Sequence, residues 1–229
     1  MSEYQYYEFL AVDRPLSEPE QAEVRTLSTR AEITATGFVN EYEWGEFRGD
    51  PTELVRRYYD AHLYLADWGT RRILLRLPRE GLTGARRYAV DELFTVEETD
   101  DHVLLDLLSE DDEGDWDYDP HEALPVIAGV RAELLTGDPR PLYLAWLAAY
   151  GTWERDEDAF DTAAEDILEP PVPPGLDQLT EPQRELARFL RVDDVLLAVA
   201  AGTDGSRRTV AELLDTAALN RTGVGGPLR

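Results

Sequence analysis

The chain has 229 residues, of which 43% are hydrophobic, and this is enough apolar material for a folded core. It carries 48 acidic residues against 22 basic ones, a formal net charge of −26, which disfavours direct contact with nucleic acid or an anionic membrane. Cysteine and lysine are both absent, so thiolate catalysis, cysteine-ligated zinc, a Walker A loop and a Schiff-base lysine are excluded.

The start of the chain and its hydropathy predict a cytoplasmic location. Residues 1–4 lack the basic start and apolar run of a signal peptide. No apolar stretch approaches the roughly 18 residues that a membrane span needs. We therefore expect a cytoplasmic protein that does not enter a membrane.

The first half of the sequence predicts strands alternating with short helices. Aromatic and β-branched runs favour strands, and Ser17 and Asp50 open two capped helix starts with a proline and a glutamate close behind. The predicted elements are a strand at 4–12, a helix at 17–28, a strand at 31–44, a helix at 50–60, and two hairpins that pair 61–67 with 71–77 and 92–97 with 102–108.

From Asp119 onward the pattern is helical. The sequence Asp-Pro-His-Glu at 119–122 predicts a capped start, and Gly137 is expected to end that helix before another begins at Asp138. The acidic, proline-rich segment 154–179 predicts a semi-rigid connector. Short helices are then expected at 181–190, 194–201 and 207–219.

An aromatic stripe marks the helix that begins at Asp138. Its members lie at helical spacing and are Tyr143, Trp146, Tyr150 and Trp153. Such a stripe is typical of a core, which is the interpretation we favour. The alternatives are a ligand groove or a surface for self-association.

This order of elements favours an α+β fold, with a ferredoxin-like N-terminal sheet and a helical C-terminal half. The predicted organisation is an α+β domain at 1–118, a helical domain at 119–221 with the connector at 154–179, and a disordered tail at 222–229.

Charge is segregated along the chain. Residues 48–87 hold nine arginines and five acids, whereas residues 91–119 hold fourteen acids and no Lys or Arg. Residues 153–170 hold eight acids and one arginine. The two acidic tracts therefore carry most of the surplus negative charge.

The arginine-rich segment allows two interpretations. Arg56, Arg71 and Arg72 are candidates for an anion-binding face, because guanidinium groups bind phosphate in a bidentate manner. Alternatively, these arginines pair with the chain's own acidic tract, which relieves repulsion within one molecule. We favour the second interpretation.

The densest acidic segment, 109–119, is the leading candidate for a binding site. Its aromatic residues, Trp116 and Tyr118, are typical anchors of a protein interface, but the same rings could pin a solvated loop to the core. The predicted partner-binding residues are Asp111, Glu113, Asp115, Trp116, Asp117, Tyr118 and Asp119.

Alternating carboxylates in this segment also suit a hard divalent cation, since an extended backbone would place them on one side. The candidate metal ligands are Asp115, Asp117 and Asp119. In that case Arg71 and Arg72 would hold the phosphate of a small-molecule substrate. The EF-hand template does not fit, because it places Pro120 where a bidentate glutamate is required.

Familiar catalytic signatures are missing from the sequence. There is no Gly-x-Ser-x-Gly elbow and no Gly-x-Gly-x-x-Gly phosphate loop. The three histidines, His62, His102 and His121, match no zinc spacing and are expected to be structural. We therefore lean against an enzyme and expect no cofactor unless a divalent cation binds.

Several segments resemble a group of acidic proteins from GC-rich bacteria. The likeness is carried by YQYYEFLAVDRPL and LSTRAEIT, then by FVNEYEWGEFRGDP, HLYLADWGTRR and PPVPPGL. The group has no assigned activity, so no functional residue carries over. The resemblance also implies that such genes lie near SWIM-type zinc-finger genes, which favours a nucleic-acid-related complex.

These features predict a non-enzymatic interaction protein that docks on a basic partner through its acidic tracts, 91–119 and 153–170. One alternative is a divalent-metal-dependent enzyme acting on a phosphorylated small molecule. Another is a DNA mimic, which ranks lower because the carboxylates cluster in two segments. The sequence leaves the oligomeric state open.

Overall fold

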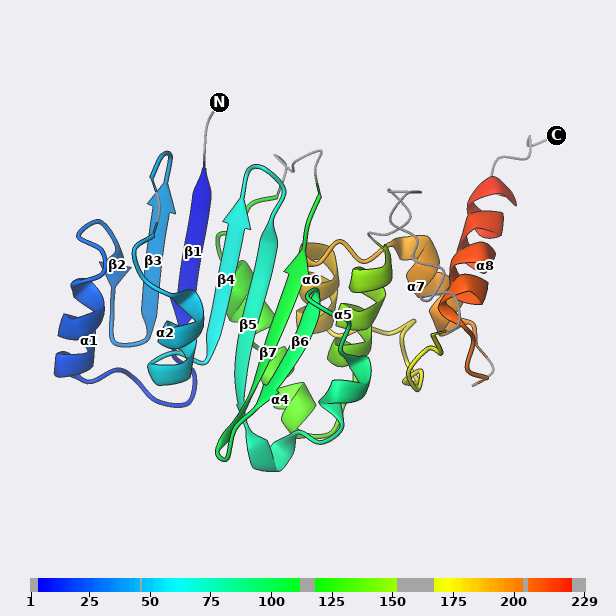
Figure 1. Cartoon of the computed structure of the whole chain (residues 1–229), viewed down its shortest axis with the longest axis horizontal. Coiled ribbons are helices and arrows are strands. Elements are labelled where there is room, and N and C mark those ends of the chain that lie inside the picture. The colour runs from blue at the N-terminus through cyan, green and yellow to red at the C-terminus, as the bar shows by residue number, and fades with distance from the viewer. Residues whose placement is uncertain (1–3, 46, 112–117, 152–166, 204–205, 224–229) are drawn as a thin grey trace.

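An antiparallel sheet forms the centre of the computed structural model, which describes residues 4–45, 47–111, 118–151, 167–203 and 206–223. Most helices follow the sheet in the chain, so the fold is α+β with helices mainly in the C-terminal half, as predicted (Figure 1). The strands are β1 (Gln5–Leu10), β2 (Glu32–Ile33), β3 (Gly37–Tyr42), β4 (Ala61–Ala66), β5 (Arg71–Pro78), β6 (Phe94–Glu98) and β7 (His102–Ser109).

Two helices, α1 (Glu18–Arg25) and α2 (Pro51–Arg57), are inserted among the strands. Two 3-10 turns, η1 (Arg79–Gly81) and η2 (Ala85–Tyr88), separate β5 from β6. The later helices are α3 (Ala123–Ile127), α4 (Val130–Leu135), α5 (Arg140–Gly151), α6 (Glu181–Phe189), α7 (Asp194–Ala201) and α8 (Val210–Gly223).

The seven described strands lie in the order β2-β3-β1-β4-β5-β7-β6. Every pairing among them is antiparallel, and both predicted hairpins are confirmed as β4–β5 and β6–β7. The first elements follow one another as β1, α1, β2, β3, α2 and β4. The finer, ferredoxin-like part of the prediction is not confirmed and stays a prediction.

The single strand predicted over 31–44 is wrong, because the chain turns back within it to form β2 and β3. The hydroxyl of Thr34 accepts hydrogen bonds from the backbone N–H groups of Thr36, at 3.2 Å, and Gly37, at 2.9 Å. A threonine side chain that bonds its own following backbone stabilises a turn. Apolar and polar residues continue to alternate through this turn, so the sequence pattern predicts one strand instead of two.

The single helix predicted from Asp119 to Gly137 is also wrong. Glu122 has a φ of +66°, outside the helical region, and two short helices follow, α3 and α4. Between them, Gly129 lies against Pro182 of α6, and a Cβ at 129 would lie only 2.8 Å from the Pro182 Cγ. The missing side chain of Gly129 therefore permits the close approach of α6 where the helix is interrupted.

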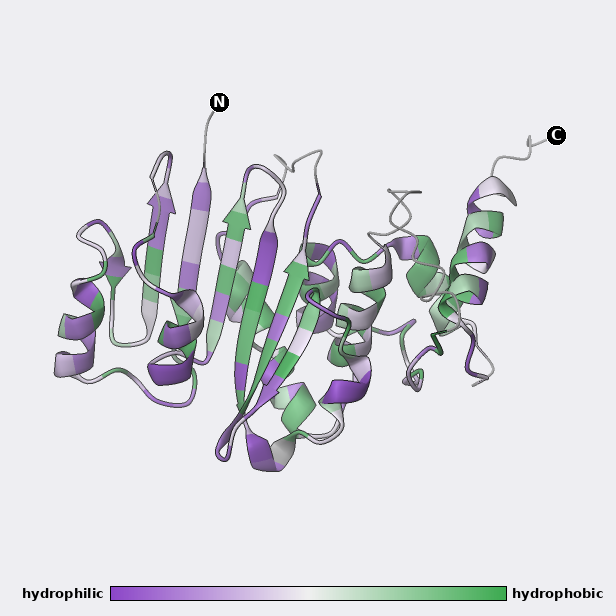
Figure 2. Ribbon diagram, viewed as in Figure 1, coloured by the Kyte–Doolittle hydropathy of each residue, from purple (hydrophilic) through white to green (hydrophobic). Residues whose placement is uncertain are grey.

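Each face of the sheet carries its own hydrophobic cluster. The larger cluster joins one face to α3–α8 and includes Tyr6, Leu63, Leu75, Leu105, Trp146 and Leu213. The smaller cluster joins the opposite face to α1 and α2 and includes Phe9, Val24, Phe38, Val55 and Leu74. Hydrophobic residues concentrate along β4, β5 and β7, whereas α1 and α2 are mostly hydrophilic (Figure 2). Alternation along the strands places the two sets on opposite faces.

The aromatic stripe of α5 lies in the larger cluster. Tyr143, Trp146 and Tyr150 are all buried, which confirms the predicted core role and excludes self-association through these three rings. Trp153 lies outside the described residues. Because this cluster also contains strand residues, side chains from both sides of the predicted boundary at 118–119 share one core, and the boundary itself stays a prediction.

The described part of the predicted connector, 167–179, packs against the body of the protein. Glu169 is fully buried, and its carboxylate accepts hydrogen bonds from the Tyr143 hydroxyl and from the Arg208 guanidinium. Residues 154–166 of the connector lie outside the described residues, as do residues 224–229 of the predicted tail. Thr222, which was predicted to lie in that tail, belongs to α8.

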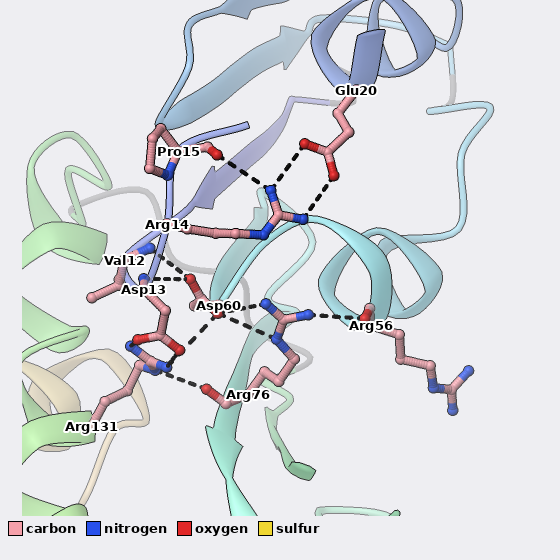
Figure 3. Close-up of polar contacts among 9 residues, drawn as sticks. All are labelled: Val12, Asp13, Arg14, Pro15, Glu20, Arg56, Asp60, Arg76 and Arg131. Carbon is pink, nitrogen blue, oxygen red and sulfur yellow. Dashed lines mark hydrogen bonds and ion pairs between the residues drawn. The ribbon is translucent and has the colours of Figure 1, made fainter. Parts of the chain in front are cut away.

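A buried carboxylate, Asp60, connects three parts of the chain (Figure 3). Its oxygens accept hydrogen bonds from the backbone N–H groups of Val12, at 2.7 Å, and Asp13, at 2.8 Å, and from the Arg76 guanidinium at 2.7 Å. Arg131 of α4, which is only 3% exposed, donates two hydrogen bonds to Asp13 and a third to the Arg76 carbonyl. The group therefore ties the end of β1, the start of β4, β5 and α4 together.

Burial alone would raise the pKa of Asp60, but the hydrogen bonds from Asp13, Arg76 and Val12 outweigh it and hold that pKa below its ordinary value. Asp60 is therefore ionised in the folded protein at neutral pH. Its negative charge is matched by two guanidinium groups, the Arg131 Nη2 lying 3.8 Å from the nearer carboxylate oxygen.

We predict that Asp60→Asn lowers the free energy of unfolding by about 3–5 kcal/mol, because it leaves buried guanidinium charge without its counter-ion. The matched control is Asp106→Asn, which removes the partner of Arg72 at a site where the carboxylate is 24% exposed and where we expect a loss of about 1 kcal/mol or less. Urea unfolding at pH 7 measures both values. Equal losses would show that the Asp60 network is no more than an ordinary surface pair.

Candidate functional site

Five strands, β1, β3, β4, β5 and β7, each have one terminus at the same end of the sheet. We call this the Gln5 end. The strand pairings bring five terminal residues side by side, and these are Gln5, Tyr42, Ala66, Arg71 and Ser109. The segments that leave these strands, including the turn between β4 and β5, lie at the upper edge of the sheet in Figure 1. This edge receives the start of the acidic segment that follows β7.

An aromatic pocket opens at the Gln5 end, on the face of the sheet that α2 covers. It has a volume of about 330 Å³. Its lining consists of Gln5, Tyr7, Phe47, Gly49, Pro51, Tyr64 and Trp68. Aromatic rings with a few placed polar groups are typical of a binding site.

The strand register builds this pocket. Tyr7 of β1 lies opposite Tyr64 of β4, and their ring centroids are 4.7 Å apart. Both hydroxyls donate to the side-chain oxygen of Gln5, at 2.8 and 3.1 Å, while the Gln5 amide donates to the Gly45 carbonyl at 2.9 Å. A buried glutamine with its oxygen and its amide both engaged fixes the two rings in place.

Two exposed tryptophans stand at the Gln5 end. Trp68, in the turn between β4 and β5, is 49% exposed and forms part of the pocket rim. Trp44, beyond β3, is 66% exposed, and the guanidinium of Arg30 lies 5.3 Å from its ring centroid. The chain thus places one of its own arginines over an aromatic face at this end.

The acidic segment starts beside Trp68. Gly69 has a φ of +102°, and a Cβ built there would lie 1.7 Å from the Asp111 carbonyl oxygen, so only glycine allows this approach. Asp111, a predicted partner-binding residue, therefore lies against the turn that carries Trp68. Glu110, which is exposed, precedes it.

Tyr118, another predicted partner-binding residue, is buried. Its hydroxyl donates to Glu185 at 2.5 Å, and its ring packs edge-on against Phe189. The guanidinium of Arg71 lies 4.4 Å from the centroid of the same ring. Of the two roles proposed for this aromatic residue, the contacts favour an anchor on the core over a contact with a partner.

Asp119, predicted both as a partner contact and as a metal ligand, is exposed and pairs with His121. The Asp119 carboxylate lies 2.6 Å from the His121 Nδ1, and Glu41 lies 3.0 Å from the Nε2. The hydrogen bond to Asp119 raises the pKa of His121, and the same bond lowers the pKa of Asp119. The other predicted residues of the segment, Glu113, Asp115, Trp116 and Asp117, lie outside the described residues.

Within the described ranges, no group of three or more histidine, cysteine, aspartate or glutamate side chains has a geometry that could hold a metal ion. Asp115 and Asp117, two of the three predicted ligands, are not in those ranges, so the metal site stays a prediction.

The three arginines predicted to bind an anion all contact other groups of the same chain. Arg56 pairs with Glu53 and Glu97, and Arg72 pairs with Asp106. Arg71 is buried and donates to the carbonyl oxygens of Arg188 and Phe189 at the end of α6. Because Glu97 and Asp106 belong to the acidic tract, these contacts favour the interpretation that the arginine segment pairs within the chain.

The aromatic pocket is not among the sites that the sequence predicts. Part of its lining could be recognised in the sequence. Gln5 and Tyr7, two residues apart, lie on the same face of β1, and Trp68-Gly69 marks a hairpin turn. The register between Tyr7 and Tyr64, which brings the rings together, depends on pairing residues that are more than fifty positions apart.

His62 lies buried beneath this pocket. Its ring stacks on Phe9 with centroids 4.0 Å apart, and its Nδ1 lies 2.8 Å from the Glu8 carbonyl oxygen, which can only accept. The proton therefore sits on Nδ1. Burial lowers the pKa of His62 to about 3, so the ring is neutral in the folded protein.

Comparison with protein-family models, with curated proteins and with solved structures finds no match for this chain. The resemblance to acidic proteins of GC-rich bacteria accordingly stays a prediction. In the described part of the chain, no helix has both the length and the hydropathy that crossing a bilayer requires.

We predict that His62 makes stability fall as the pH drops below about 6.5. The unfolded chain binds a proton on this ring near pH 6.5, whereas the folded protein does so only near pH 3, so protonation favours unfolding between these values. From pH 7.5 to pH 5.5 the His62 contribution to the free energy of unfolding should fall by about 1.4 kcal/mol.

The control is His62→Asn, whose amide can replace the Nδ1 donor but cannot be protonated. Urea unfolding at both pH values should give a smaller decrease for the variant than for the unmodified chain. Identical decreases in the two proteins would mean that His62 is not the group responsible.

Proposed function

We propose that this protein is a non-enzymatic interaction protein that binds an arginine-rich or lysine-rich segment of a partner at the Gln5 end of its sheet. The observation that carries the proposal is the position of the aromatic pocket and exposed Trp68 directly beside Asp111, in a chain of net charge −26. A nucleic-acid-binding protein is one class of partner with such a segment. A cytoplasmic location remains part of the proposal.

Electrostatics support a basic partner. The described acids at the Gln5 end include exposed Glu41, Glu43, Glu110 and Asp119. Several of the chain's arginines are already neutralised by internal ion pairs, so they do not offset these acids. Complementary charge of this kind speeds encounter and orients the partner, and its range at physiological salt is about 8 Å.

Aromatic rings add a short-range contact that charge alone does not provide. A guanidinium or ammonium group over an exposed indole ring contributes about 0.5–2 kcal/mol. Arg30 over Trp44 is an internal example of this geometry. We propose that a basic side chain of the partner occupies the equivalent position over Trp68, with its stem against the pocket.

The test uses a fluorescein-labelled synthetic peptide of alternating arginine and glycine, titrated with the full chain and followed by anisotropy. We predict that Trp68→Ala weakens binding about fivefold, because it removes the cation–π contact and part of the pocket wall. The matched control is Leu219→Ala on α8, which removes another exposed apolar side chain and should change the Kd less than twofold.

Raising the salt concentration from 50 to 500 mM should weaken the complex of the unmodified chain strongly, because screening removes the charge attraction. The proposal fails if the peptide does not bind at low salt. It also fails if Trp68→Ala and Leu219→Ala have the same effect, since binding would then be general attraction to an acidic molecule.

A further inference from the structure

A second surface of the protein is an apolar groove lined by arginines, whereas the Gln5 end is acidic. A groove with a volume of about 860 Å³ runs between α6, α7 and the segment 176–179. Its apolar lining includes Leu176, Leu179, Ala187, Val192, Leu197 and Ala201. Of these, Leu197, Val192 and Leu179 are only partly buried against the core, so apolar surface faces the opening.

The charged lining of the groove is net positive. Three arginines, Arg184, Arg188 and Arg191, line it together with two aspartates, Asp177 and Asp194. Within the described residues, no carboxylate forms an ion pair with Arg184, whose guanidinium donates to the Leu179 carbonyl at 2.7 Å. The Arg188 guanidinium lies 3.6 Å from the Glu185 carboxylate, and the Arg188 side chain is 63% exposed. An excess of arginine is notable in a chain that has 26 more acids than bases.

The walls of the groove are fixed to the sheet. Arg191 has a φ of +58°, and its guanidinium donates to the Ser109 hydroxyl at 3.1 Å and to the Gly69 carbonyl at 3.0 Å. Arg71 donates to the last carbonyl oxygens of α6. The groove is therefore a preformed feature, which lowers the entropic cost of binding.

We propose that this groove binds an acidic amphipathic helix of a partner protein. Apolar side chains of that helix would lie on the groove floor, and its carboxylates would pair with Arg184 and Arg188. These two arginines are four residues apart on α6 and so lie on the same side of that helix. This surface is separate from the Gln5 end, and the inference does not depend on the function proposed there.

A helix fits better than an extended segment because of backbone hydrogen bonding. The walls are largely helices, whose N–H and C=O groups are already paired, so they offer no edge to which a strand could add. A helix satisfies its own backbone and can enter an apolar groove without leaving unpaired groups. Helix α6 has nine residues and is about 14 Å long, which matches about two and a half turns of a partner helix.

The net negative charge of the molecule does not prevent this contact. Charges separated by more than about 8 Å are largely screened at physiological salt, so the local field is set by the charges of the lining itself, which are three arginines and two aspartates. Helix-in-groove recognition uses apolar anchors at positions i, i+3, i+4 and i+7, and the charged flanks set the orientation and partner choice.

The test uses a fluorescein-labelled 16-residue peptide with leucines at those anchor positions and glutamates on both flanks, together with the full chain. We expect saturable binding that Arg184→Glu combined with Arg188→Glu weakens at least tenfold. The matched control combines Arg57→Glu with Arg86→Glu, which makes the same change of net charge at two exposed arginines elsewhere and should change the Kd less than twofold.

A peptide of the same composition in scrambled order should bind at least tenfold more weakly, because it cannot present one apolar face. The proposal is overturned if the ordered peptide does not bind, or if both charge-reversal pairs weaken it equally. It is also overturned if light scattering finds a dimer that the Arg184/Arg188 variant lacks, since the occupant would then be a second copy. Occupancy by oleate without binding of the peptide would instead assign the groove to a small amphiphile.

Discussion

The buried carboxylate of Asp60 holds the described parts of the chain in one arrangement. It accepts hydrogen bonds from two backbone N–H groups just after β1 and from the guanidinium of Arg76 on β5. Arg131 of α4 donates to the Arg76 carbonyl and so links Asp60 and its partners to the helical layer (Figure 3). Burying a charge is costly unless several donors compensate it, and here the donors come from segments that are far apart in sequence. The network therefore exists only when the sheet and α4 have docked correctly.

Internal pairing of this kind explains how a strongly acidic chain uses its arginines. Arg72, Arg76 and Arg131 neutralise carboxylates within the protein, and Arg71 and Arg191 fix the end of α6 to the sheet. Surplus acid is left at the surface, together with the aromatic pocket of the Gln5 end. Arg191 reaches from the arginine-lined groove to Gly69, so the two proposed binding surfaces share one structural contact.

Much of the secondary structure could be predicted from local sequence, whereas the candidate site could not. Capping residues such as Ser17 and Asp50 locate helices because their partners lie within three residues. The break at Gly129 depends on Pro182, and the pocket depends on the register of β1 with β4, so both arise from distant pairings that no local pattern contains. Tyr118 shows the same limit, because only the fold reveals that its ring lies beneath Arg71.

Arginines that pair within the chain leave surplus acid at the Gln5 end, and we propose that a basic partner contacts this surface. Photo-crosslinking with an arginine-rich peptide that carries benzoylphenylalanine, followed by mass spectrometry, locates that contact directly. We expect cross-links concentrated at the pocket lining, around Phe47, Tyr64 and Trp68. Cross-links spread evenly over the acidic surface, or concentrated on α5–α8, would overturn the proposal.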